Sequence, residues 1–227
     1  MTALISGVKE LDTRADVPRI RAFIADLSAT PSAVAIIAEL DSAERERAST
    51  FVVQEARESF VRRRWLRRAL IASVFNIDAA RIAIESDHLG CPRIVAPAAL
   101  RSVSLSTSTA GRLALVALRE GGRIGIDIAS VDPSHATADA AAVFMSPRER
   151  SAWASNCDPG EFFRLWTRKE AALKALGTGF AIDPPLADVT GPTLSLRDPG
   201  SRPVVEILDI PAPARHAAAL ALARTPS

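Results

Sequence analysis

One segment of the chain carries side chains whose types and spacing suit proton or phosphate chemistry. In Phe162–Gly179 (FFRLWTRKEAALKALGTG), an unbroken run of good helix formers precedes a glycine stop, which predicts a helix. Trp166, Glu170 and Lys174 are four residues apart, so an aromatic ring, a carboxylate and an ammonium group share one face of that helix. Trp166 is expected to pack in the core.

A second acid lies in a segment that is otherwise apolar. The run Arg123–Ile128 is rich in strand-forming residues, and Asp127 is its one carboxylate. A buried strand rarely holds a carboxylate unless that group is paired, hydrogen-bonded or bound to a metal. Asp127 and Glu170 are therefore candidates to hold one divalent cation between them.

The choice of lysine over arginine points to the same helix. Of 28 basic residues only three are lysines, Lys9, Lys169 and Lys174. Arginine keeps its proton in proteins, whereas lysine can release one when its surroundings lower its pKa. Chance placement is one explanation. The other is that Lys174 handles a proton, or contacts one phosphate oxygen as a point charge.

Two further features are candidate phosphate sites. On the expected helix Glu55–Phe75, residues Arg57, Arg64 and Arg68 fall on one narrow stripe of an otherwise largely apolar surface. That stripe is explained either by internal salt bridges and solvent contact or by a phosphate cradle. Ser104–Gly111 (SLSTSTAG) is expected to be a hydroxyl-rich loop able to face phosphates.

Bulk composition excludes several classes of protein. The net charge of +2 implies no polyelectrolyte partner, so no nucleic-acid binding is expected. Two cysteines, Cys91 and Cys157, give neither a disulfide framework nor zinc spacing. The chain start does not resemble a signal peptide, and no apolar run is long enough to span a bilayer. We expect a soluble cytoplasmic protein without membrane contact.

Strands and long helices occur in both halves of the chain, which predicts an α+β protein of two similar lobes. Residues 1–32 form a lead-in before an N-terminal lobe at 33–115 and a C-terminal lobe at 116–227. The expected helices are Val17–Leu27, Ala43–Phe51, Glu55–Phe75, His135–Phe144, Pro147–Ala154 and Gly160–Leu176. The expected strands are Ala33–Leu40, Arg81–Glu85, Arg93–Val95, Val103–Ser106, Leu113–Leu118, Arg123–Ile128, Pro203–Leu208 and His216–Ala223.

Three features together resemble the 4′-phosphopantetheinyl transferase superfamily. They are the GIDIA run, the 43-residue spacing from Asp127 to Glu170, and the segment WTRKEAALKALGTG. The resemblance is to the larger, surfactin-synthetase-activating type, and it extends from about residue 33 to the end. The family's second motif, Trp/Phe-x-x-Lys-Glu-Ala-x-x-Lys-x-x-Gly, is matched in full by Trp166, Lys169, Glu170, Ala171, Lys174 and Gly177.

The resemblance implies a pseudo-twofold monomer of two α+β lobes with the site between them. It implies transfer of phosphopantetheine from coenzyme A to a serine of an acyl or peptidyl carrier protein, releasing adenosine 3′,5′-bisphosphate. In that activity Asp127 and Glu170 would ligate Mg²⁺, and Glu170 or a metal-bound water would take the serine proton. Lys174 would bind the phosphate and neutralise or protonate the leaving bisphosphate. Coenzyme A would contact Arg57, Arg64, Ser106, Thr107 and Lys174.

Three positions depart from the family pattern. Ala129 stands where a third acid is usual, Thr107 where a histidine is usual, and Cys91 where a lysine is usual. These losses predict weaker coenzyme A binding, with Arg93 or the arginine stripe compensating. They also favour an alternative, a diverged non-catalytic homologue that binds a carrier protein or a nucleotide. A transferase using another phosphodiester donor is a third hypothesis.

Overall fold

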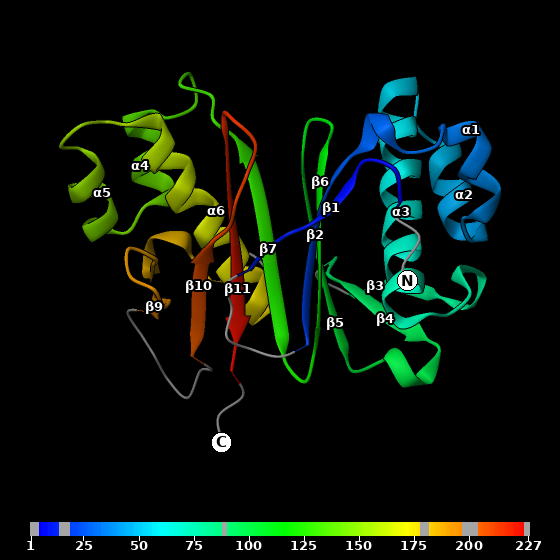
Figure 1. Cartoon of the computed structure of the whole chain (residues 1–227). Coiled ribbons are helices and arrows are strands. Elements are labelled where there is room, and N and C mark those ends of the chain that lie inside the picture. Colours follow the sequence, from blue (N-terminus) through cyan, green and yellow to red (C-terminus); the bar gives the residue numbers. More distant parts are fainter. Residues whose placement is uncertain (1–4, 14–18, 88–89, 178–181, 197–203, 225–227) are drawn as a thin grey trace.

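The computed structural model describes residues 5–13, 19–87, 90–177, 182–196 and 204–224 (Figure 1). Its helices are α1 (Ala33–Ile36), α2 (Ser42–Ser49), α3 (Gln54–Phe75), α4 (Ala138–Phe144), α5 (Pro147–Trp153) and α6 (Pro159–Leu176). Its strands are β1 (Val8–Glu10), β2 (Ile20–Asp26), β3 (Ala83–Ser86), β4 (Pro92–Ala96), β5 (Val103–Ala110), β6 (Leu113–Glu120), β7 (Arg123–Ser130), β8 (Ala187–Asp188), β9 (Ser195–Leu196), β10 (Val205–Asp209) and β11 (His216–Ala223). The predicted α+β fold class is confirmed.

The elements form four layers. A six-stranded antiparallel sheet has the order β1-β2-β6-β5-β4-β3, and a three-stranded antiparallel sheet has the order β10-β11-β7. The two sheets face each other, with α3 on the outer face of the larger sheet and α6 on the outer face of the smaller one (Figure 1). Helices α1 and α2 pack on the far side of α3.

Strand β7 shows how the sequence alternation builds two of these layers. Its isoleucines Ile124, Ile126 and Ile128 belong to the core between the two sheets. The intervening residues, among them Gly125 and Asp127, lie on the opposite face of the strand, because successive side chains of a strand point to opposite faces. That face packs against α6. The alternation therefore carries Asp127 toward the helix that holds Glu170 and Lys174.

Two predicted elements in the first 40 residues are wrong. The expected helix Val17–Leu27 is instead β2 in its described part, paired with β1 and β6. Phe23 packs toward α3 and Ala22 toward the smaller sheet, so a strand covered on both faces gave no clear alternation. The expected strand Ala33–Leu40 is α1 followed by a 3₁₀ turn, because the Ser32 hydroxyl accepts a hydrogen bond from the Ala35 N–H and caps a helix.

The predicted loop Ser104–Gly111 is also wrong, because β5 continues to Ala110. Its odd-numbered residues Val103 and Leu105 belong to the core beneath α3, and its serines lie on the opposite face. Dense hydroxyl residues usually indicate a turn, but threonine is also a good strand former.

The remaining expected elements lie close to those observed, with ends that differ by a few residues; part of the expected strand Pro203–Leu208 falls outside the described residues. Strands β1 and β2 come from residues 1–32, and β6 crosses the expected lobe boundary at 115/116. The division of the chain into lobes stays a prediction.

Candidate functional site

Helix α6 crosses β7 in direct backbone contact. The helix begins after Asp158, whose carboxylate accepts hydrogen bonds from two backbone N–H groups, and ends at Gly177 in the left-handed conformation (φ 66°). At Gly125 an added Cβ would lie 1.9 Å from the Ala171 carbonyl oxygen. Only glycine permits this approach, so the GID run of β7 sets how closely the helix lies over Asp127.

Asp127 and Lys174 meet across this contact. The Lys174 Nζ lies 2.7 Å from the Oδ1 of the buried Asp127 and 3.1 Å from the Ile126 carbonyl oxygen. The Ser108 hydroxyl donates to the same Oδ1 at 2.6 Å. Asp127 is thus a buried carboxylate with two donors on one oxygen, as its position in an apolar strand requires. Ser108 was not among the predicted site residues.

Glu170 lies one helical turn before Lys174 and lines the same cavity. Burial raises the pKa of Glu170, the negative charge of Asp127 raises it further, and Lys174 partly offsets both effects. Two acids that destabilise each other's charge are a suitable pair for one cation. Among the described residues no group of three or more His, Cys, Asp or Glu side chains is placed to hold a metal, so the centre offers two acids.

A cavity of about 960 Å³ lies beside this centre. Its walls come from β4, β5, the start of β7 and the second half of α6. Glu170, Lys174, Ser106 and Thr107 all line it, and their roles as site residues stay predictions. Asp127 reaches the same place through its contact with Lys174.

A second cavity of about 340 Å³ adjoins the first and shares Gly90, Pro92 and Thr107 with it. Three arginines of α3 line this arginine cavity: Arg63, Arg64 and Arg67. Burial lowers the pKa of Arg67 to about 10, and the charge of Arg64 adds to the effect, against the opposing pull of Glu44. The Arg67 Nε is buried without a hydrogen-bond partner among the described residues. Such a cavity is suited to an anion.

The predicted arginine stripe separates into different environments. Arg68 is buried and makes ion pairs with Glu44 and Asp41, which matches the salt-bridge alternative. Arg64 lies 3.9 Å from Glu44 and faces the arginine cavity, whereas Arg57 is exposed and lines neither cavity. The coenzyme A contacts proposed for Arg57 and Arg64 stay predictions.

Sequence reasoning missed Arg63, which lines the arginine cavity and approaches the Thr109 hydroxyl at 3.4 Å. Burial lowers the pKa of Arg63, and the charge of Arg64 adds to this shift. The sequence could have indicated Arg63, because it precedes Arg64 on the same long helix. It lies outside the stripe of Arg57, Arg64 and Arg68 that the sequence analysis named.

Lys169 lies away from the cavity. Its side chain is fully buried, and the Nζ contacts the Glu149 Oε2 at 2.7 Å and the carbonyl oxygens of Phe144 and Pro184 at 2.9 Å each. All three ammonium N–H groups therefore have acceptors. Trp166 stacks on Phe144 at 4.5 Å between ring centroids, as expected for a core residue.

The turn before β4 contributes Gly90, Cys91 and Pro92 to the cavity wall. Burial raises the pKa of the Cys91 thiol, as does the charge of Asp87. Arg93, named as a compensating cation, also lines the larger cavity.

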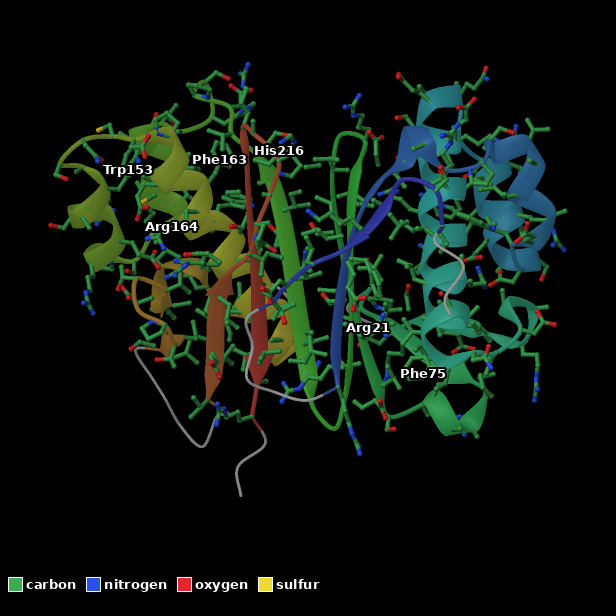
Figure 2. The ribbon with its side chains drawn as sticks, viewed as in Figure 1. Arg21, Phe75, Trp153, Phe163, Arg164 and His216 are labelled. Atoms are coloured by element: carbon green, nitrogen blue, oxygen red, sulfur yellow. The ribbon has the colours of Figure 1, made fainter. Side chains whose placement is uncertain are left out.

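The side-chain view in Figure 2 shows how α6, with Arg164 and Phe163 labelled, covers the face of the smaller sheet.

The fold and the site define an α+β protein in which Asp127, Glu170 and Lys174 form an acid–lysine centre beside a large cavity. Residues 123–221 match the family model of the 4′-phosphopantetheinyl transferase superfamily, so this part of the chain is similar to that superfamily. This range holds all of β7 and α6, and with them Asp127, Glu170 and Lys174.

Two curated relatives carry the same family name. One is the 4′-phosphopantetheinyl transferase HetI of Nostoc sp., 31% identical over 149 residues, which are 64% of this chain and 63% of that protein. The other is a 4′-phosphopantetheinyl transferase of Bacillus subtilis, 29% identical over 150 residues, which are 65% of this chain and 64% of that protein. The chain thus spans slightly under two thirds of the length of these relatives. Within the described residues, no helix has the length and apolar character needed to cross a membrane.

Proposed function

We propose that the protein transfers 4′-phosphopantetheine from coenzyme A to a serine of an acyl or peptidyl carrier protein, in an Mg²⁺-dependent reaction. The observation that supports this most is the acid–lysine centre, in which Asp127, Glu170 and Lys174 meet beside a cavity of about 960 Å³. The protein is proposed to act as a cytoplasmic monomer.

In this reaction the serine oxygen attacks the phosphorus that bears the pantetheine group. The bond from that phosphorus to the oxygen of the adenosine bisphosphate breaks, and adenosine 3′,5′-bisphosphate leaves. Glu170 accepts the serine proton as general base. Lys174 places an ammonium group on the leaving phosphate and offsets its new charge.

Asp127 and Glu170 are the residues that would hold Mg²⁺. Two carboxylates in one site, with Lys174 beside them, fit a cation that commonly uses one or two carboxylates together with substrate phosphates. When bound there, Mg²⁺ would neutralise pyrophosphate oxygens.

The arginine cavity is the proposed place for a further phosphate of coenzyme A. It adjoins the larger cavity at Gly90, Pro92 and Thr107, so one extended ligand is proposed to reach both. Arg63 and Arg64 supply positive charge there, and their position offers compensation for the histidine and lysine missing at Thr107 and Cys91.

The same departures support the second candidate, a non-catalytic homologue that binds a carrier protein or a nucleotide. Ala129 packs at the edge of the core beneath α6, so this chain has no acid at that place. Mass spectrometry of apo carrier proteins, incubated with coenzyme A, Mg²⁺ and this protein, separates the two functions. A mass increase equal to phosphopantetheine, absent with Asp127→Ala or Glu170→Ala, supports the transferase. Carrier-protein binding with no mass increase across the panel would favour the non-catalytic homologue.

A further inference from the structure

The two sheets meet at β5 and β7, which pack closely although they belong to different sheets. Strand β7 is the edge of the smaller sheet and pairs with β11 on one side only. The N–H groups that point to its other side belong to buried residues, Ile124 at 2% and Ile126 at 0% exposure. Buried N–H groups need acceptors, and no strand ladder supplies them here.

Serine hydroxyls of β5 act as those acceptors. The Ser104 Oγ accepts from the Ile124 N–H at 3.2 Å, and the Ser106 Oγ accepts from the Ile126 N–H at 3.1 Å. Ser108, the next residue on the same face of β5, donates to Asp127 Oδ1 at 2.6 Å. We call Ser104, Ser106 and Ser108 the serine bridge.

The serine bridge meets the acid–lysine centre at two points. Both backbone polar groups of Ile126 have partners, since its N–H donates to Ser106 and its carbonyl accepts from the Lys174 Nζ. Asp127 Oδ1 accepts from both Ser108 and Lys174, which fixes the carboxylate and directs these donors to one of its two oxygens. A change in the bridge therefore moves the groups that contact Asp127 and Lys174.

We propose that the serine bridge holds the two sheets in the register that the reaction requires, and that Ser108 is the residue that orients Asp127. Ser104 and Ser106 are positioning residues that act through the backbone of β7. For Ser106 this gives the hydroxyl a partner within the fold. The catalytic consequence and the metal site at Asp127 rest on the proposed function, but the hydrogen bonds do not.

Amide hydrogen exchange tests the first part directly. Ser104→Ala should speed exchange of the Ile124 amide at least about fivefold and leave Ile126 closer to wild type, because one buried bond is lost. Ser106→Ala should do the reverse. The matched control is Ser155→Ala, because the Ser155 hydroxyl only bonds the nearby Ala152 carbonyl. Unchanged exchange at both isoleucines in both variants would overturn the bridge.

Metal binding and kinetics test the role of Ser108. In Ser108→Ala, Mn²⁺ binding followed by electron paramagnetic resonance without coenzyme A should weaken about tenfold, as when the partner of a metal ligand is removed. The kcat of transfer should fall, the coenzyme A KM should change less, and Ser108→Thr should restore both Mn²⁺ binding and kcat. Wild-type Mn²⁺ affinity and kcat in Ser108→Ala would overturn the orienting role.

The two tests separate this inference from the proposed function. If the wild-type protein transfers nothing from coenzyme A, the proposed function fails while amide exchange still tests the bridge. If transfer is normal but the three alanine variants behave as Ser155→Ala does, the proposed function stands and the positioning role is refuted.

Discussion

Gly125→Ala should displace α6 from β7 and thereby separate the acid–lysine centre. The added Cβ would lie 1.9 Å from the Ala171 oxygen and 2.7 Å from the Ala175 nitrogen, whereas ordinary contact begins at 3.4 Å. Both obstructing atoms belong to helix backbone, so a side-chain rotation cannot relieve the overlap. The helix must move by about 1.5 Å or the strand must bend. Overpacking of this kind costs about 1–3 kcal/mol.

The displacement has separate effects on stability and on activity. For a chain of this length the cost lowers Tm by about 2–12 °C. Because the Lys174–Asp127 contact is only 2.7 Å long and spans the same interface, a shift above 1 Å should reduce kcat about 10²-fold or more. Thermal unfolding by circular dichroism and transfer to a carrier protein measure the two effects.

Gly191→Ala is the matched control, because its nearest atom would be the Thr193 oxygen at 3.9 Å. It should leave Tm and kcat near wild type. A Gly125→Ala protein with wild-type Tm and kcat would refute the close approach of α6 as the reason for glycine in the GID run.

Three further changes test the site and its support. Lys169→Met leaves Glu149 buried without its cation and should cost about 3–5 kcal/mol in urea unfolding; a cost below about 1 kcal/mol would contradict a structural ion pair. Since the pKa of Glu170 is raised, its carboxyl favours the folded state below the usual carboxyl pKa, and this contribution is lost as pH rises through the folded pKa. Glu170→Gln should therefore raise the Tm of the metal-free protein at pH 7 but not in acid, and a lower Tm at pH 7 would count against this. Lys174→Arg should reduce kcat ~10²–10⁴-fold if Lys174 caps the leaving phosphate, while the exposed Lys9→Arg changes nothing; equal small effects would reject that role.

Local signals predicted the elements that carry the acid–lysine centre. Helix α6 has a helix-forming run and a glycine stop, and β7 has a β-rich run with one acid. Together with the family resemblance, these signals named Asp127, Glu170 and Lys174. Glu170 and Lys174 line one cavity, and Asp127 contacts Lys174. Their roles in catalysis stay predictions.

Tertiary contacts decided the features that the sequence did not reveal. Strand β2 is covered on both faces, so its pattern did not distinguish it from a helix. The serine-rich run of β5 indicated a loop in the sequence. The N–H groups of β7 that its serines bind lie about 20 residues away, so the local sequence could not reveal them. Arg63 and Arg68 belong to one helix but lie on different faces of it. Arg68 pairs with Glu44 and Asp41, whereas Arg63 lines the arginine cavity.

The two lysines of α6 were retained for different physical reasons. Nothing supports a role in proton or phosphate chemistry for Lys169, since its ammonium is fully buried among a carboxylate and two carbonyl oxygens. A compact group with three divergent donors fits these acceptors, whereas a planar guanidinium would leave donors unpaired in a closed space. Lys174 is partly exposed at the cavity, and its contacts with Asp127 and the Ile126 carbonyl leave its ammonium facing the space beside Glu170. Lys169 therefore fixes α6 against α5 through Glu149, whereas Lys174 is the lysine of α6 that lines the larger cavity.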